Sequence, residues 1–350
     1  MPNFLEQSSS ELTTLLASWD EPVFRIGQIR RWVFSRKMFE FAAMSDLSKQ
    51  LRERLTTMFG TSVFAGKVTV HTKSEDVTEK LLVEWNDGNC IECVLLRDDR
   101  NHRTACVSTQ VGCAMGCRFC ASGLDGFVRN LSRGEIMEQI LRLNALLPAS
   151  ERLTHLVVMG TGEPLLNLDN LTNALVETVS TDGLDLGGRK VTISTVGIPS
   201  GIKKLADLGC QYKLAISLHA PNDNLRSEIV PQNKVNSIAP IMAAADEYFE
   251  KVGRRVTFEY VLIKNLNDRP EHARELAKLL RGRTAVVNLI PFNPVTELKY
   301  KTPNAETIRN FTETLKANNI QVKVRYKKGD KINAACGQLR RMNKVLETQT

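Results

Sequence analysis

Three cysteines lie close together in the segment QVGCAMGCRFC, residues 110–120, at positions Cys113, Cys117 and Cys120. Thiolates in this arrangement select zinc or an iron–sulfur cluster. A structural zinc site usually takes four ligands, and Cys106 is poorly placed as the fourth because it falls inside a predicted strand. Three thiolates on a cubane [4Fe-4S] cluster instead leave one iron open to the amino and carboxylate groups of S-adenosylmethionine. The spacing therefore favours such a cluster, with structural zinc or unligated core cysteines as the alternatives.

Strands and helices alternate in the part of the chain that must position these cysteines. From residue 103 onward, short β-rich runs are separated by helix-like stretches such as SRGEIMEQILRLNALL and RPEHARELAKLLR. This alternation implies parallel strands joined by right-handed crossovers. The runs are TACVST, THLVVMG, KVTISTVG, YKLAISLHA, RVTFEYVLI and AVVNLIPFN. Six repeats are too few for a complete eight-fold barrel, so we expect an α/β fold with a partial (β/α)6, TIM-like barrel and a C-terminal extension that contains IQVKVRY.

Polar or glycine-rich residues stand at the ends of five predicted strands. In α/β folds the functional residues collect at the C-terminal ends of the strands and in the loops that follow. We therefore expect these residues to line one pocket. They are the cysteine segment 113–120, the GTGEP segment 160–164, Ser194 with Thr195, Ser217 with Leu218 and His219, and Asn293.

Two segments precede the barrel. Residues 1–61 look helical, and the stretch FRIGQIRRWVFSRK within them is rich in basic residues. Residues 62–100 contain three β-like runs, VFAGKVTV, KLLVEW and CIECVLLRDD. We expect a helical N-terminal accessory domain at 1–61, a β-strand extension at 62–100, and the barrel with its C-terminal extension at 101–350.

The composition limits the cellular setting and the class of partner. The chain has 350 residues, a formal net charge of +8 and eight cysteines. A basic balance favours a polyanionic partner such as nucleic acid, although an ordinary basic enzyme has the same charge. The opening residues lack the basic and apolar regions of a signal peptide, and no apolar run approaches the ~20 residues that cross a bilayer. We expect a cytoplasmic protein without membrane association, in which cysteines are reduced, metal-bound or catalytic.

Five motifs, in order along the chain, resemble those of one enzyme family. CxxxCxxC with Phe119 before the last cysteine resembles the signature of the radical S-adenosylmethionine superfamily. More narrowly, STQVGCAMGCRFC, GTGEPLLN, SLHAPND, NLIPFNP and AACGQL resemble the RlmN/Cfr family of RNA adenosine methyltransferases, over nearly the whole chain. The resemblance implies a radical S-adenosylmethionine barrel whose [4Fe-4S] cluster is held by Cys113, Cys117 and Cys120. It also implies that the N-terminal helices form an accessory domain that binds RNA.

The same resemblance assigns residues to the S-adenosylmethionine site. Gly162 and Glu163 match the motif associated with the methionine amino group, and a buried carboxylate facing an ammonium makes a charge-assisted pair. His219 by itself would more often be a satisfied core histidine, and its place in SLHAPND reverses that expectation. The other matching positions are Ser194, Ser217, Leu218 and Asn293.

Cys336 lies far downstream in NAACGQL and on its own would be interpreted as a small core residue. The resemblance implies that it carries a methyl group, and that two S-adenosylmethionine molecules are used per turnover. One methylates Cys336 by direct displacement, and the second provides a 5′-deoxyadenosyl radical that takes hydrogen from the S-methyl group. The resulting methylene radical adds to the adenine and joins protein to RNA. Ordinary methyl transfer fails at C2 of adenine because this carbon has no lone pair to attack a sulfonium.

Release of the product needs a base and a thiol. The resemblance makes Glu92 the proton acceptor for the C2 proton, where the residues alone allow a surface glutamate on an edge strand. It makes Cys106 the thiol that frees the sulfur through a transient disulfide with Cys336, which is acceptable in the cytosol because it is catalytic. Cys90 and Cys93 form a CxxC, but an odd separation on a strand places them on opposite faces, so we expect packing residues.

The expected substrates are an adenosine of 23S rRNA in the peptidyl-transferase region and an adenosine in tRNA anticodon loops, flipped out for the reaction. An electron donor such as a flavodoxin or ferredoxin system and a monomeric state complete the hypothesis. One alternative is a Cfr-type enzyme that methylates C8 and confers antibiotic resistance; another is a non-catalytic, zinc-containing RNA-binding protein. Basic residues for RNA contact, or for a merely solvated surface, are Arg25, Arg30, Arg31, Arg36, Lys37, Lys323, Arg325, Lys327, Lys328, Lys331, Arg340, Arg341 and Lys344.

Overall fold

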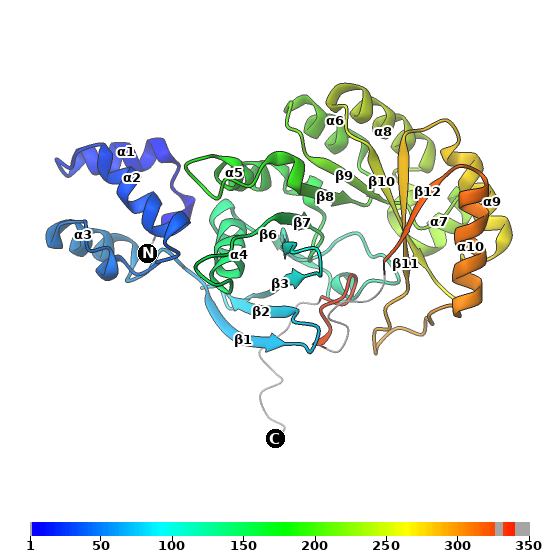
Figure 1. Ribbon diagram of the computed structural model, residues 1–350, viewed down its shortest axis with the longest axis horizontal. Helices are drawn as coiled ribbons and strands as arrows, with labels where there is room; N and C mark the ends of the chain where they lie inside the picture. The colour runs from blue at the N-terminus through cyan, green and yellow to red at the C-terminus, as the bar shows by residue number, and fades with distance from the viewer. Residues whose placement is uncertain (1, 326–331, 340–350) are drawn as a thin grey trace, which may run out of the picture.

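The computed structural model describes residues 2–325 and 332–339 of the chain. A helical N-terminal segment lies at one end of the molecule, and a large α/β body forms the rest (Figure 1). The body is organised around a ten-stranded sheet whose strands follow one another in sequence order, from β1 to β12 with β5 and β6 left out. This arrangement confirms the expected α/β class.

The sheet has an antiparallel part and a parallel part. Strands β1 to β4 pair antiparallel, and β4 then pairs parallel with β7, as do all the strands that follow to β12. The strands are β1 (Lys67–Lys73), β2 (Glu79–Glu84), β3 (Cys90–Arg97), β4 (Arg103–Cys106), β7 (His155–Val158), β8 (Val191–Thr195), β9 (Lys213–Ser217), β10 (Val256–Leu262), β11 (Ala285–Pro291) and β12 (Gln321–Val324). Because the parallel strands all point the same way, their C-terminal ends meet at one edge of the barrel.

The C-terminal extension supplies one more parallel strand than the six that the alternation predicted. Helix α10 (Ala305–Ala317) crosses back over the sheet, and β12 then pairs with β11. Val322 and Val324 of β12 pack against the main core, while the alternate residues Gln321 and Lys323 are exposed. A short strand with only one buried face has a weak hydrophobic signal, which explains why IQVKVRY appeared as an extension and not as a repeat.

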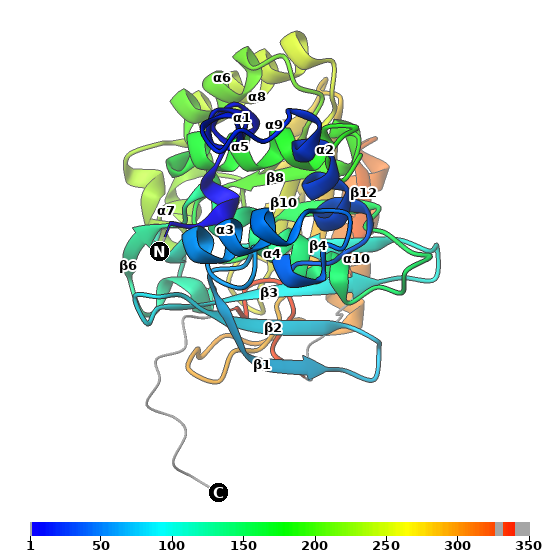
Figure 2. The same cartoon turned by 90° about the vertical axis from the view of Figure 1, so that its left-hand side faces the viewer.

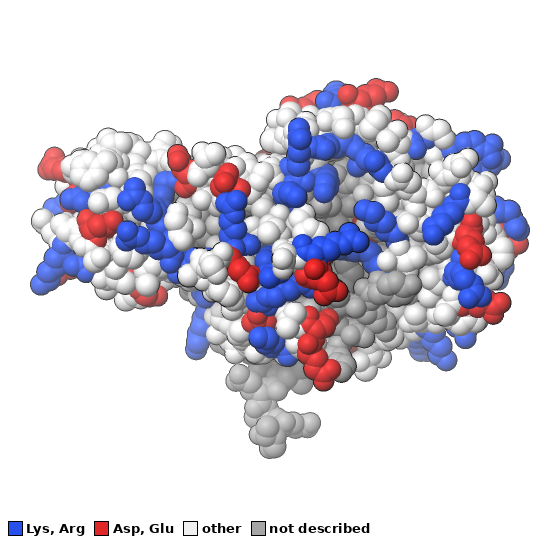
Figure 3. All heavy atoms as spheres, viewed as in Figure 1, with Lys and Arg blue, Asp and Glu red and all other residues white. Residues whose placement is uncertain are grey.

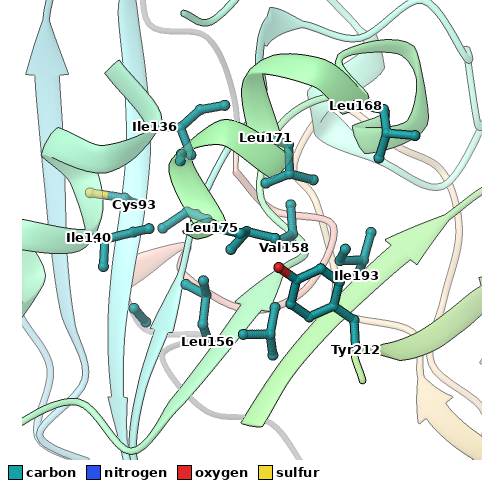
Figure 4. Packing of buried hydrophobic residues seen from close by; sticks show 14 of the residues in the cluster. Cys93, Ile136, Ile140, Leu156, Val158, Leu168, Leu171, Leu175, Ile193 and Tyr212 are labelled. Atoms are coloured by element: carbon teal, nitrogen blue, oxygen red, sulfur yellow. The ribbon is translucent and has the colours of Figure 1, made fainter. Parts of the chain in front are cut away.

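Helices cover the outer face of the parallel strands and close the core. Figure 4 shows Ile136 and Ile140 of α4 and Leu171 and Leu175 of α5 among the side chains of the strands, including Ile193. All are fully buried, and each such side chain contributes about 1.5–3 kcal/mol of transfer free energy. The helices are α4 (Arg133–Ala145), α5 (Leu168–Val179), α6 (Pro199–Asp207), α7 (Asp223–Ile229), α8 (Ile238–Val252), α9 (Pro270–Leu280) and α10.

The N-terminal helices pack on α4 and α5, as Figure 2 shows with strands β1 to β3 below them. Glu6 accepts a 2.8 Å hydrogen bond from the backbone N–H of Gly134 in the first turn of α4, and Arg30 pairs with Glu177 of α5 at 2.6 Å. Buried side chains of both parts belong to one hydrophobic core. The segment comprises α1 (Ser9–Ser18), α2 (Phe24–Arg30), α3 (Lys49–Phe59) and the short helical turns Phe4–Glu6, Arg31–Ser35 and Phe41–Ala43.

A small ribbon that the sequence patterns did not predict frames the cysteine segment. Strands β5 (Gln110–Gly112) and β6 (Phe127–Asn130) pair antiparallel on either side of it. Gly112 has a φ of +73°, and a Cβ there would lie 1.8 Å from the carbonyl oxygen of Gly126. Only glycine allows this close approach. Among the described residues, no helix has the length and apolar character to cross a membrane.

Candidate active site

The cysteine segment begins directly after β5 and ends at the short turn Ala121–Gly123. Its three cysteines, Cys113, Cys117 and Cys120, line one cavity of about 140 Å³, which we call the cluster-side cavity. The same cavity is lined by residues from the ends of β7, β8 and β9 and by Cys336. The strand-end residues predicted to share a pocket thus largely do so.

Burial controls the protonation of these thiols. It raises the pKa of Cys113 to about 11, and it raises the pKa of Cys117 well above its ordinary range, with the charges of Cys120 and Cys113 adding to the effect. The free thiols therefore stay protonated at neutral pH, and metal ligation would have to displace the protons. In the ranges 2–325 and 332–339, no three His, Cys, Asp or Glu side chains converge on a point that could hold a single metal ion.

Glu163 is held rigidly beside the cysteines. Its carboxylate accepts hydrogen bonds from the backbone N–H groups of Val196, at 2.8 Å, and Leu165, at 3.1 Å. Its own backbone N–H donates to Gln110 of β5 at 2.8 Å. Gly162 has a φ of +110°, and a Cβ there would meet Gln110 at 2.6 Å. Burial raises the pKa of Glu163, so a cationic partner in the cavity would favour its ionised form.

The other residues predicted to contact the cofactor do not all line this cavity. Ser194, Ser217 and His219 line the cluster-side cavity. Burial, with the charge of Arg226, lowers the pKa of His219 to about 3, and its Nδ1 accepts the backbone N–H of Val261 at 3.0 Å. The ring is therefore neutral with its proton on Nε2. Leu218 packs in the main core instead, with no exposed surface.

Residues 332–339, which we call the Cys336 loop, are tied to the cysteine segment. The backbone N–H of Ala121 donates to the carbonyl of Gly337 at 2.8 Å, and the Ser122 hydroxyl donates to the carbonyl of Leu339 at 2.7 Å. Asn293, after β11, donates to the carbonyl of Cys336 at 3.0 Å. Tertiary structure thus brings Cys336 beside a segment from which it is far removed in sequence.

Cys336 also borders a second cavity of about 270 Å³, which we call the thiol-side cavity. Cys106 lines it from β4, and Asn293 and Arg325 line it from the other side of the barrel. Burial raises the pKa of Cys106 to about 12, and the charge of Cys336 adds to the rise. Both cysteines are free thiols. Cys336 thus lines both cavities. Burial of its thiol raises the pKa of Cys336 as well.

Glu92 lies in β3 between β2 and β4, which excludes the alternative of an edge-strand surface glutamate. Its side chain is buried and forms an ion pair of 2.6 Å with Lys80. Lys80 also donates to the carbonyl of Asn333 in the Cys336 loop at 3.3 Å. The Glu92 side chain lines neither the cluster-side nor the thiol-side cavity, and Lys80 links it to the Cys336 loop.

Two further charged residues, Arg226 and Glu259, belong to this region and are not part of the predicted site. Arg226 is completely buried and donates to the carbonyls of Leu218 and Ser217 at 3.1 and 3.2 Å, and to Asn233 at 2.8 Å. It therefore fixes the end of β9. Glu259 lies in VTFEYVL of β10 and lines the cluster-side cavity. A carboxylate within an apolar strand is unusual, and this signal in the sequence could have identified Glu259.

The basic residues proposed for RNA contact differ in their surroundings. Lys37 donates to three backbone carbonyls, including that of Glu151 at 2.8 Å, and Arg30 is paired with Glu177. Arg36 stacks over Trp32 and Arg25 over Phe24, whose ring is 60% exposed. On the face shown in Figure 3, Lys and Arg gather over the N-terminal helices and around the central recess. Lys327, Lys328, Lys331, Arg340, Arg341 and Lys344 lie outside the described residues.

Comparisons with known proteins agree over almost the full chain. The radical SAM superfamily model matches residues 107–280, and the model for the ribosomal RNA large subunit methyltransferase N-terminal domain matches residues 2–60. A probable dual-specificity RNA methyltransferase RlmN from Rhodopirellula baltica is 52% identical over 97% of this chain and 91% of that protein. The corresponding protein of Symbiobacterium thermophilum is 45% identical, over 95% and 90%. The crystal structure of a radical SAM methyltransferase from Sphaerobacter thermophilus matches with a TM-score of 0.92 and 40% identity, over 96% of this chain and 98% of that one.

Proposed function

The chain belongs to the RlmN family of radical S-adenosylmethionine RNA methyltransferases, and from this premise we propose that it methylates C2 of adenosine. The proposed substrates are an adenosine of 23S rRNA in the peptidyl-transferase region and an adenosine of tRNA anticodon loops. Membership of the family implies a [4Fe-4S] cluster and S-adenosylmethionine. The proposal adds ligation by Cys113, Cys117 and Cys120, and a reductant of the flavodoxin or ferredoxin class.

The observation that carries the proposal is the position of Cys336 between two cavities. On one side lie the three cysteines and Glu163, which suit a cluster and the methionine ammonium. On the other side lies Cys106, with space for part of a nucleoside. A methyl group on the Cys336 sulfur could therefore meet the cofactor from one side and the RNA base from the other.

The chain's own residues have separate proposed tasks. When bound, the cluster and the cofactor supply methylation of Cys336 and a radical able to remove a hydrogen atom from that methyl group. Glu163 binds the ammonium of the methionine moiety, while Ser194, Ser217 and the neutral His219 offer hydrogen bonds along the same cavity. Once the methylene carbon has joined the base, and the adduct has given up one electron and its C2 proton, Cys106 loses its thiol proton and attacks the Cys336 sulfur. A disulfide forms, the carbon–sulfur bond breaks, and the electron pair stays on the carbon, which takes up a proton to become the methyl group.

Glu92 is the proposed acceptor of the C2 proton. Its carboxylate forms an ion pair of 2.6 Å with Lys80. Because its side chain lines neither cavity, the role requires Glu92 or the Cys336 loop to move when RNA binds. Lys80 donates a hydrogen bond to Asn333 in the Cys336 loop. A movement of the loop would therefore also shift Lys80 and alter its ion pair with Glu92.

Mass spectrometry of methylated rRNA and tRNA fragments, with 2-methyladenosine and 8-methyladenosine standards, tests the proposal. We expect 2-methyladenosine in both RNAs. Exclusive 8-methyladenosine would instead support the Cfr-type reaction. Iron and sulfide analysis after anaerobic purification tests the metal separately: a colourless protein with zinc and no iron would refute the enzyme and support a non-catalytic RNA-binding protein.

A further inference from the structure

Glu259 is a buried carboxylate to which the proposed mechanism gives no task. It lies in the middle of β10, and the strand register pairs it with Ser217 of β9 and Asn288 of β11. Residues paired across neighbouring strands share one face of a sheet, so these three polar side chains form a row. The Glu259 side chain is only 4% exposed and lines the cluster-side cavity.

The two carboxylate oxygens of Glu259 differ in their partners. Asn288 donates to Oε1 at 2.9 Å, which fixes the carboxylate plane. Oε2 is buried and has no hydrogen-bond partner in the described part of the chain. A buried polar atom without a partner costs stability, and such atoms in folded proteins call for a ligand or another explanation. Oε2 therefore marks a place in this cavity where a bound molecule can supply a hydrogen bond.

The position of Glu259 selects the part of the cofactor that can reach it. Glu163 and the three cysteines line the part of the cavity that is proposed to hold the methionine moiety of the cofactor. Cys336 lines the same cavity as Glu259. If hydrogen is to pass between Cys336 and C5′ of the cofactor, the ribose that bears C5′ must lie beside Cys336. The ribose hydroxyls are then the nearest hydrogen-bonding groups of the cofactor to Glu259.

We propose that Glu259 binds a ribose hydroxyl of S-adenosylmethionine through Oε2 and thereby positions C5′ beside Cys336. The inference rests on the proposed function, because it takes the cofactor from there. A hydroxyl both donates and accepts, so it can bond the carboxylate in either protonation state. Ser217, which is paired with Glu259 across β9 and β10, lines the same part of the cavity.

The test measures binding and does not depend on turnover. The cluster-loaded, full-length protein is titrated anaerobically with S-adenosylhomocysteine and with its 2′-deoxy and 3′-deoxy counterparts in a calorimeter. We expect the wild-type protein to lose about tenfold in affinity when the bonded hydroxyl is absent, the loss typical of one such hydrogen bond to a charged group. Glu259→Met should bind S-adenosylhomocysteine about tenfold more weakly and should no longer distinguish the deoxy compounds, while Glu259→Gln should recover part of the discrimination.

Glu177→Met is the matched control. It replaces a second buried glutamate, on α5, that lines neither cavity and has no proposed catalytic task, and it should retain the wild-type affinity for all three compounds. Equal binding of the three compounds by the wild-type protein would overturn the inference, even if Glu259→Met failed to fold. Undiminished discrimination in Glu259→Met would also overturn it. Failure of the wild-type protein to bind S-adenosylhomocysteine at all would refute the proposed function itself, together with this inference.

Discussion

The side-chain amide of Asn293 donates a 3.0 Å hydrogen bond to the main-chain carbonyl of Cys336. This bond joins the end of β11 to the Cys336 loop, and it acts together with a 2.9 Å bond from Gln338 to the carbonyl of Pro294. The residue that the family motif assigns to the cofactor is therefore also a residue that orients the proposed methyl carrier. Small displacements of a reacting group cost large factors in rate, so this bond has a measurable consequence.

Asn293→Ala should lower the rate of RNA methylation by about tenfold or more, because the Cys336 carbonyl loses its donor and the loop its orientation. Product is measured by mass spectrometry of the RNA, and methylation of Cys336 by the mass of the intact protein. Gln338→Ala should act in the same direction, whereas Cys336→Ala should abolish methylation and leave the iron and sulfide content unchanged. Sustained turnover by Cys336→Ala would exclude the methyl-carrier role.

Cys106→Ala should accumulate a covalent protein–RNA species, because no thiol remains to take up the Cys336 sulfur across the thiol-side cavity. The species is detected by denaturing electrophoresis with labelled RNA. Cys210→Ala is the matched control, since Cys210 packs against the main core and lines neither cavity. Normal release of methylated RNA by Cys106→Ala would contradict the proposed disulfide step.

Glu92→Gln should trap the same kind of covalent species at an earlier point, before the C2 proton is lost. An amide cannot accept the proton, although its shape preserves the packing of β3. Use of RNA deuterated at C2 separates the two variants: the trapped species should retain deuterium in Glu92→Gln and lose it in Cys106→Ala. Loss of deuterium in both would assign the proton to another acceptor.

Arg226→Lys should lower the free energy of unfolding by about 2–4 kcal/mol, because one ammonium cannot satisfy all the acceptors that the planar guanidinium reaches. Burial lowers the pKa of Arg226 to about 10, because removal from water destabilises the charged guanidinium. Urea unfolding followed by circular dichroism measures the change. Arg274→Lys, in an exposed pair with Glu271 on α9, should change stability by less than about 0.5 kcal/mol. Equal effects of the two substitutions would show that the Arg226 network is not stabilising.

The lowered pKa of His155 predicts that the folded protein loses stability in mild acid. Burial, together with the positive charges of His102, Lys190 and Lys213, lowers the pKa of His155 to about 4 in the folded protein, against the opposing charge of Asp98. An unfolded chain binds this proton near pH 6.5, so between about pH 6.5 and 4 only the unfolded state is protonated and stability falls as the pH falls. His155→Gln should flatten the dependence by about 1 kcal/mol, allowing for solvent screening of a half-buried ring. Identical slopes for both proteins would refute the assignment.

Local patterns in the sequence were sufficient for the class of fold and for much of the site. The period of the apolar residues indicated parallel strands with helices between them, and residues at successive strand ends had to meet because parallel strands end at one edge. The same patterns missed β5 and β6, and they did not identify β12 as a further parallel strand of the sheet. Each of these strands is short and half exposed or held by backbone pairing, so its hydrophobic period is weak.

The sequence by itself determined which residues could do chemistry here, since three closely spaced thiols and a glycine-flanked glutamate are properties of local spacing. Only the tertiary structure decided which distant residues meet them. It placed Cys336 between two cavities, gave Glu92 a buried lysine partner, and left one oxygen of Glu259, a residue that lines the cluster-side cavity, without a hydrogen bond in the described part of the chain. These relationships depend on how the Cys336 loop packs against the ends of strands that lie far away in the chain. No local pattern encodes them, because hydrogen bonds and burial between distant segments exist only once the chain has folded.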